Sequence, residues 1–315
     1  MFKYILKKLG LFLFVFLGIT FLSFCLTYLS PSDPAEIMLN KTGVPPTREL
    51  LEQTREEMGL NRPMLVQYGD WLLGMLQGDM GTSYKSGKPV MEELMKALPD
   101  TVILTGVSML VVMLISIPLG ILCARFKDSP LDLAVRFVTY LFASVPSFFL
   151  SLLTLYFFSV KLRLFPVIAF KNGVKGMVMP VMVLALSLSA WYIRQVRTIV
   201  LEELGKGYIS GSRARGVPEY KILFSHVLKN AMLPIMTLLG LSLANMLSGT
   251  TIVENIFSWQ GLGKLALDAI SARDYPVIQA YVVWLALIFL LVNFLVDISY
   301  GLIDPRVRKG QGEQK

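Results

Sequence analysis

The residues best suited to chemistry lie in a polar interval, 208–234, between two long apolar segments. Arg213 and Arg215 stand in this interval beside Gly216, and lysines follow toward its end. Such side chains form ion pairs and hydrogen bonds with a partner surface. His226, the only histidine of the chain, also falls here, and no second residue forms a recognisable catalytic pair with it. The interval therefore indicates binding rather than catalysis.

The backbone of this interval is predicted to form two short helices that meet at a corner. Gly216 can adopt the left-handed conformation that closes a helix. Pro218 is tolerated in a first helical turn, and Glu219 beside it suits the positive end of the helix dipole. Apolar residues then recur with helical spacing and predict one apolar face opposite a basic one. They are Tyr220, Leu223, Phe224, Val227 and Leu228.

Two kinds of chemistry have no motif in this sequence. No segment matches G-x-x-x-x-G-K-[ST], the loop that cradles nucleotide phosphates. The nearest approach, Gly263-Lys264, continues with a leucine. Histidine, cysteine and carboxylate residues show no spacing typical of metal ligands. We therefore expect no catalytic residue, no metal site and no cofactor in this chain.

The composition indicates an integral membrane protein. Of 315 residues, 54% are hydrophobic and only 17% charged, against about 25% charged in globular domains. A helix needs roughly 20 residues to cross the bilayer core of about 30 Å. Six uncharged runs approach or exceed that length: 9–29, 101–124, 137–160, 176–193, 231–253 and 275–296. The sequence predicts an all-α fold with six transmembrane helices.

The net charge of +8 is explained by membrane topology, so we expect contact with lipid and none with nucleic acid. Seventeen lysines and arginines fall in the termini and in the second-to-third and fourth-to-fifth connections. The short connections on the other side carry only six. The positive-inside rule then places both termini in the cytoplasm.

These spans divide the chain into four parts. An N-terminal transmembrane helix, 1–30, precedes an extracytoplasmic insertion, 31–100. The insertion is predicted to contain a helix over 48–58, closed by Gly59, and another over 89–97 that leads into the second span. A transmembrane core, 101–303, includes a cytoplasmic loop, 197–230, and a cytoplasmic tail, 304–315, follows.

Prolines and polar residues within the spans each allow two interpretations. Pro118, Pro146 and Pro180 predict bends, which could be moving hinges or fixed kinks that shape the packing. In the fifth span, Asn245, Ser248 and Thr250 either line a wet pathway or bond neighbouring helices. For Asn245 we favour the pathway, because an amide is costly to bury in mid-span.

The corner segment resembles the "EAA loop" of ABC importer membrane subunits. That pattern has Glu-Ala-Ala, three residues and a glycine, followed later by an aliphatic residue and Leu-Pro. Here Gly216 and Leu228 match, whereas Ser210, Gly211 and Ser212 stand at the Glu-Ala-Ala positions, and His226 and Lys229 also depart from it. The later Leu233-Pro234 resembles the peptide/nickel branch, as do segments along nearly the whole chain. These include Val66-Gln67-Tyr68, Gly81-Thr82-Ser83, Glu254-Asn255-Ile256-Phe257, Asp274-Tyr275-Pro276 and Asp304-Pro305-Arg306.

The resemblance implies the MetI-like type I permease fold in a bacterial plasma membrane, with an insertion after the first helix. It also implies a second homologous permease, two cytoplasmic ATPase subunits that bind ATP and Mg²⁺, and an extracellular solute-binding protein. The expected ATPase-coupling residues are Ser210, Gly211, Ser212, Arg213, Ala214, Arg215, Gly216, Val217, Pro218 and Glu219. Arg213 and Arg215 could contact the ATPase or act only as topology charges.

The cargo has two candidates by resemblance. The insertion segments and the segment from Glu254 are most similar to nickel-importer permeases, which favours nickel or a metal chelate. Di- or oligopeptide import is the alternative. A secondary transporter would show inverted repeats and charged residues in mid-span, and we find neither in the sequence.

Overall fold

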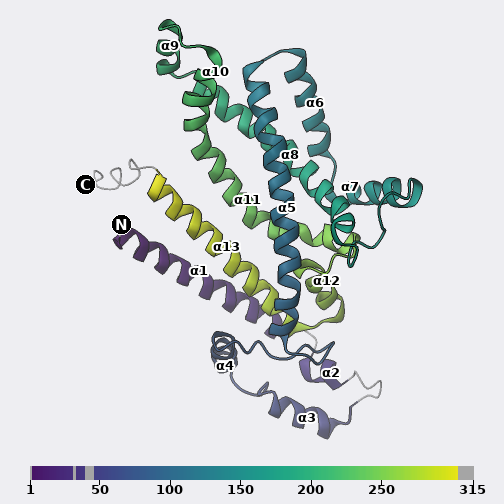
Figure 1. Ribbon diagram of the computed structural model, residues 1–315. Helices are drawn as coiled ribbons and strands as arrows, with labels where there is room; N and C mark the ends of the chain where they lie inside the picture. Colours follow the sequence, from purple (N-terminus) through teal and green to yellow (C-terminus); the bar gives the residue numbers. More distant parts are fainter. Residues whose placement is uncertain (1, 31–32, 40–45, 304–315) are drawn as a thin grey trace. The chain divides into compact units, whose positions relative to one another are not determined.

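The computed structural model describes residues 2–30, 33–39 and 46–303, and the statements below concern these ranges (Figure 1). Their regular structure is helical, apart from an isolated bridge between Thr82 and Pro89. The chain forms two compact units. The first contains the residues up to Thr101 together with Gln260–Phe294, and the second contains Val102–Trp259 and the residues from Leu295.

The first unit packs the insertion onto parts of three long helices. Its elements are α1 (Phe2–Tyr28), α2 (Pro34–Leu39), α3 (Arg48–Glu57), α4 (Met64–Leu76), the start of α5 (Val90–Arg125), α12 (Leu262–Ala272) and most of α13 (Tyr275–Ile303). Its core includes Val90, Leu94, Leu262 and Val277, all nearly inaccessible. Burial of these apolar side chains supplies the main driving force for the unit.

The insertion confirms one predicted helix and changes another. The predicted helix over 48–58 is α3, where Thr47 Oγ1 accepts a hydrogen bond from the Leu50 amide (3.4 Å) and Gly59 has φ +68°. The helix predicted over 89–97 is not separate, because the backbone stays helical past Pro99 into the second span. The resulting α5 has 36 residues, a length of about 54 Å.

Asp274 fixes the insertion to the start of α13. Its carboxylate accepts hydrogen bonds from Ser83 Oγ (2.6 Å) and from the backbone amides of Tyr84 and Lys85 (both 3.0 Å). Asp274 is 1% exposed, and a carboxylate that accepts several bonds without solvent is held firmly. Burial, and then the negative charge of Asp274, raise the pKa of the Tyr84 phenol. Two sequence segments singled out by resemblance thus meet here.

The second unit contains the remaining helices. They are the rest of α5, α6 (Pro130–Ser144), α7 (Ser147–Thr154), the π-helix η2 (Leu155–Lys161), α8 (Gly173–Leu204), α9 (Gly207–Ala214), α10 (Glu219–Lys221), the π-helix η3 (Ile222–Val227) and α11 (Leu228–Ile256). Tyr192 of α8 donates to the Leu238 carbonyl of α11 (2.8 Å). At Gly176, a Cβ would lie 2.0 Å from the Ala169 carbonyl oxygen, so only glycine allows this approach.

The described residues contain five helices long and apolar enough to span a membrane, or six if one bent pair counts as a span. That pair, Pro130–Ser144 and Ser147–Lys161, is bent by 98°. The run predicted as the third span, 137–160, falls on this pair, and the bend predicted at Pro146 is confirmed as a sharp break between two helices. Proline disfavours helical backbone in the residue before it, and Val145 before Pro146 is extended. Pro118 and Pro180 instead lie within the continuous helices α5 and α8.

Candidate functional site: the polar corner between α8 and α11

The corner between α9 and α10 turns at Gly216, which has φ +73° as predicted. The Gly216 amide donates to the Arg213 carbonyl (2.9 Å) and the Val217 amide to the Ser212 carbonyl (3.2 Å). These bonds satisfy the last carbonyls of α9. Pro218 lies one position before the first helical residue, Glu219, rather than inside the first turn.

An ion pair bridges the two sides of the corner. Arg213 Nε donates to Glu219 Oε1 (2.6 Å) and Nη2 to Oε2 (3.4 Å). This hydrogen bond raises the pKa of the Arg213 guanidinium. Both side chains are substantially exposed, and such pairs contribute roughly 0–1 kcal/mol. The pair therefore sets the geometry of the corner more than its stability.

Glu203, at the end of α8, anchors the corner to the long helices. Its carboxylate, 6% exposed, accepts hydrogen bonds from the Lys206 amine, the Tyr208 hydroxyl and Asn230 Nδ2 (3.2 Å). Asn230 Nδ2 also donates to Tyr208 Oη (2.9 Å). The bond to Glu203 raises the pKa of Lys206, whereas burial, followed by that bond, raises the pKa of Tyr208. One carboxylate thus joins α8, α9 and α11.

The second helix of the corner buries only part of the apolar face predicted for it. Ile222 and Val227 are fully buried, whereas Tyr220 and Phe224 are 70% and 61% exposed. The expected single apolar stripe assumed an α-helical period, but η3 is a π-helix. Its i→i+5 hydrogen bonds place residues five apart on one face. Leu223, Val227 and Leu228 of the predicted apolar face pack against the core as expected, whereas Tyr220 and Phe224 do not and project outward.

A pocket of about 310 Å³ lies beside the corner. It is lined by Tyr208, Ser212, Arg215, Ser225, His226 and Asn230. Arg215 Nη2 donates to Ser212 Oγ (3.4 Å), and Ser212 Oγ donates to the Tyr208 carbonyl (2.9 Å). Only Ser212 and Arg215 were expected as site residues, because the other four enter the pocket from outside the motif.

The ten residues expected to couple to an ATPase form one mostly exposed surface. Ser212 is buried and Val217 and Glu219 are half-buried, whereas seven are exposed: Ser210, Gly211, Arg213, Ala214, Arg215, Gly216 and Pro218. The structure pairs Arg213 with Glu219 and Arg215 with Ser212. The two arginines therefore have different surroundings, which the sequence did not show.

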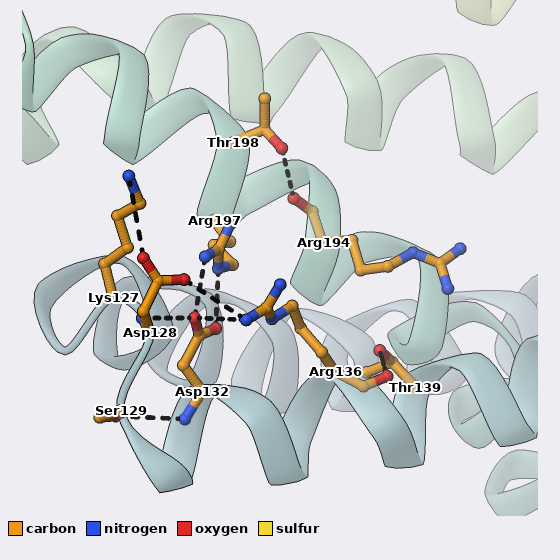
Figure 2. A network of polar contacts seen from close by, with 9 residues as sticks. All are labelled: Lys127, Asp128, Ser129, Asp132, Arg136, Thr139, Arg194, Arg197 and Thr198. Atoms are coloured by element: carbon orange, nitrogen blue, oxygen red, sulfur yellow. Dashed lines mark hydrogen bonds and ion pairs between the residues drawn. The ribbon is translucent and has the colours of Figure 1, made fainter.

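A second ion pair fixes α8 to α6 (Figure 2). Arg197 Nε and Nη2 donate to the two carboxylate oxygens of Asp132, each at 2.8 Å. Asp132 is fully buried and also accepts from the Asp128 amide (3.0 Å), with Arg136 Nη2 at 3.4 Å. Sequence counting treated Arg136 and Arg197 only as topology charges. We call Asp132 and Arg197 the α6–α8 clamp.

The expected pathway residues all lie on α11. Thr250 is fully buried within this chain. The side chains of Asn245 and Ser248 are outside the part that the structure describes. Within residues 2–30, 33–39 and 46–303, no group of three or more His, Cys, Asp or Glu could hold a metal ion.

Two family models cover most of the chain. Residues 116–309 match the binding-protein-dependent transport system inner membrane component, and residues 1–105 match the N-terminal part of the same kind of membrane component. The chain belongs to this family of ABC importer permeases, in its peptide/nickel branch. It is a membrane-embedded transport component and not an enzyme.

Relatives of two substrate types align along nearly their whole length. The metal-staphylopine import permease CntB of Staphylococcus aureus is 37% identical over 98% of this chain and 99% of its own. The oligopeptide permease AppB of Bacillus subtilis is 37% identical over 96% and 98%. The dipeptide permease DppB of Escherichia coli is 34% identical over 98% and 99%.

A chain of the inward-facing MetNI methionine ABC transporter shares the fold. Its TM-score is 0.59 at 19% identity, over 68% of this chain and 97% of that one. The predicted MetI-like fold is therefore confirmed. Permeases of this family lie in the cell membrane and work with an ATPase and a substrate-binding protein.

Proposed function

We propose that segment 197–230 couples an ATPase partner to the membrane spans. The observation that carries this proposal is the Glu203 carboxylate, which joins α8, α9 and α11 directly behind the exposed corner. A force on α9 reaches both long helices through these bonds, because a buried hydrogen-bonded carboxylate resists separation from its donors. The coupling surface comprises the ten residues from Ser210 to Glu219.

The transport cycle follows from this connection. Two ATPase subunits bind ATP and Mg²⁺ and draw together, and the corner moves with the subunit it contacts. The α6–α8 clamp carries the displacement of α8 to α6. A second homologous permease completes the pathway, so that this chain forms half of it and alternates its access between the two membrane faces.

The remaining assignments belong to the same proposal. Both termini are cytoplasmic, by the positive-inside rule. Residues 31–100 form the extracytoplasmic insertion, and the transmembrane core extends over 101–303. Asn245 and Ser248 line the pathway, where amide and hydroxyl groups suit a polar, hydrated cargo, whereas the fully buried Thr250 is withdrawn from this set.

We propose nickel or a metal chelate as the cargo. The identity of 37% to a permease named for metal-staphylopine import supports it. Neutral amide and hydroxyl groups in the pathway also suit the polar periphery of a chelate. Di- or oligopeptide import is the second candidate, which the equal identity to AppB supports.

Uptake of nickel, nickel chelates and short peptides in cells lacking the chain tests both the proposed cargo and the proposed coupling role of the corner. Cells carrying the intact protein or Gly216→Asp provide the comparison, with membrane abundance measured for each. Loss of nickel or chelate uptake alone supports the metal cargo, and loss of peptide uptake alone moves the assignment to peptides. Normal transport by Gly216→Asp protein would show that the corner does not couple.

A further inference from the structure

We propose that the pocket beside the corner receives a carboxylate side chain of the ATPase partner, with Arg215 as its main ligand. This inference rests on the proposed coupling function and assigns the chemistry of that contact. The pocket is the 310 Å³ space bounded by Tyr208, Ser212, Arg215, Ser225, His226 and Asn230. We call it the corner pocket.

Of the residues that the structure describes, Arg215 is the one lysine or arginine that lines the corner pocket. Arg213 is neutralised by Glu219, and Lys206 by Glu203. Arg215 makes no ion pair within the described ranges, and its guanidinium donates a hydrogen bond to the neutral Ser212 hydroxyl. An arginine is always charged in a protein. The corner pocket therefore carries a positive charge that a partner can neutralise.

The sequence around Arg215 strengthens this imbalance. Residues 207–217 contain Arg213 and Arg215 but no Asp or Glu. Lys221 and Lys229, both exposed, follow on the next helices and add to the positive potential. A surface of this sign attracts an acidic partner surface and repels a basic one.

The hydrogen-bonding groups of the pocket suit a carboxylate. The Tyr208 hydroxyl, the Ser212 hydroxyl and the Asn230 amide already donate to atoms of this chain. Arg215 keeps most of its N–H donors, which form a planar fork that binds a carboxylate through two parallel bonds. Ser225 adds an exposed residue with a hydroxyl group to the lining.

The surface beside the pocket indicates a protein as the source of that carboxylate. Tyr220 and Phe224 project from the same corner, 70% and 61% exposed. Exposed aromatic residues beside an arginine are typical of the residues that dominate protein interfaces. An apolar contact next to one buried ion pair would orient the ATPase on the corner.

The test measures the affinity of the detergent-purified ATPase for membranes that contain the assembled permeases. The variants are Arg215→Gln, Arg215→Glu and Gly216→Asp, with Lys127→Ala as the control for loss of a cytoplasmic charge. We expect graded weakening, with Arg215→Glu at least about tenfold weaker than the intact protein, because a buried unpaired charge is costly. Lys127→Ala should bind as the intact protein does.

Rescue identifies the source of the carboxylate. Each exposed acidic residue of the ATPase is changed to lysine, and we expect one change to restore binding to Arg215→Glu. Loss of binding that no such change rescues overturns the inference. The inference is also overturned if Arg215→Glu binds the ATPase normally. That conclusion holds even if inorganic phosphate binds the intact permease and does not bind this variant.

The two proposals fail in different ways. If Arg215→Glu binds the ATPase normally and Gly216→Asp does not, docking at the corner stands and the carboxylate assignment is wrong. If all variants bind normally while present at wild-type abundance, docking at the corner itself is wrong.

Discussion

The guanidinium of Arg197 meets the fully buried carboxylate of Asp132 with two bonds of 2.8 Å, which fixes α8 to α6 six residues before Glu203. Removing Arg197 would leave the buried Asp132 carboxylate only the longer contact with Arg136, at 3.4 Å. The clamp and the Glu203 junction therefore lie in series along the last two turns of α8.

Removing one side of the clamp should destabilise the protein. Arg197→Ala leaves the Asp132 carboxylate buried without its main partner, and we expect a loss of about 3–5 kcal/mol. Thermal unfolding of the purified protein measures the change. Lys127→Ala, at an exposed neighbour of the same network, should change the midpoint little. Equal effects of the two substitutions would contradict a specific role for the clamp.

Neutralising Glu203 should uncouple the corner without releasing the ATPase. Glu203→Gln weakens the bonds to Lys206, Tyr208 and Asn230 but leaves the exposed surface unchanged. We expect substrate-stimulated ATP hydrolysis to fall about fivefold or more, with ATPase binding retained. Glu202→Gln, at the exposed neighbouring carboxylate, is the matched control and should hydrolyse ATP normally. Parallel losses in both variants would argue against a specific coupling role.

Adding a side chain at Gly216 should strain the corner. Its φ of +73° costs a residue with a Cβ about 1–2 kcal/mol, so Gly216→Ala should lower thermal stability by that amount. Gly211→Ala, inside α9 with open space at its Cβ position, should leave stability unchanged or raise it. A stabilising effect of Gly216→Ala would contradict the described backbone.

Removing the Asp274 carboxylate should loosen the insertion. Asp274→Ala leaves the buried Ser83 Oγ and two partly buried backbone amides without this acceptor, and an unsatisfied buried group costs about 1–3 kcal/mol. Limited proteolysis should then cleave residues 79–89 faster than in the intact protein. Asp70→Asn, which alters only an exposed ion pair with Arg62, should be cleaved at the original rate.

The sequence was sufficient to predict the structural features that depend only on residues close together in the chain. The left-handed turn at Gly216, the helix that begins after Thr47 and most of the apolar spans follow from composition and glycine positions. A bend at Pro146 was predicted but its size was not, because proline also occurs inside the continuous helices α5 and α8. Its position alone did not distinguish a kink from a turn of 98°.

Contacts between distant segments could not be predicted from the sequence. Asp132 and Arg197 are 65 positions apart, and Glu203 and Asn230 are 27 apart. In the sequence, a charged residue near the end of a span is explained equally well by membrane topology and by a contact with a distant segment. The exposed position of Phe224 depends on π-helical hydrogen bonds, which no spacing of apolar residues distinguishes from an α-helix.

The Ser83–Asp274 bond has a consequence for chimaeras between this permease and its relatives. Residues 33–100 form one continuous segment of the sequence that could be exchanged by itself. In the folded protein, however, this segment is bonded to the residues at the start of α13. A chimaera that exchanges this segment alone takes the Asp274 carboxylate from one parent and its three hydrogen-bond donors from the other. Exchanging 1–101 together with 260–294, which form one compact unit, keeps donor and acceptor from one parent, so these two segments form the natural unit of recombination.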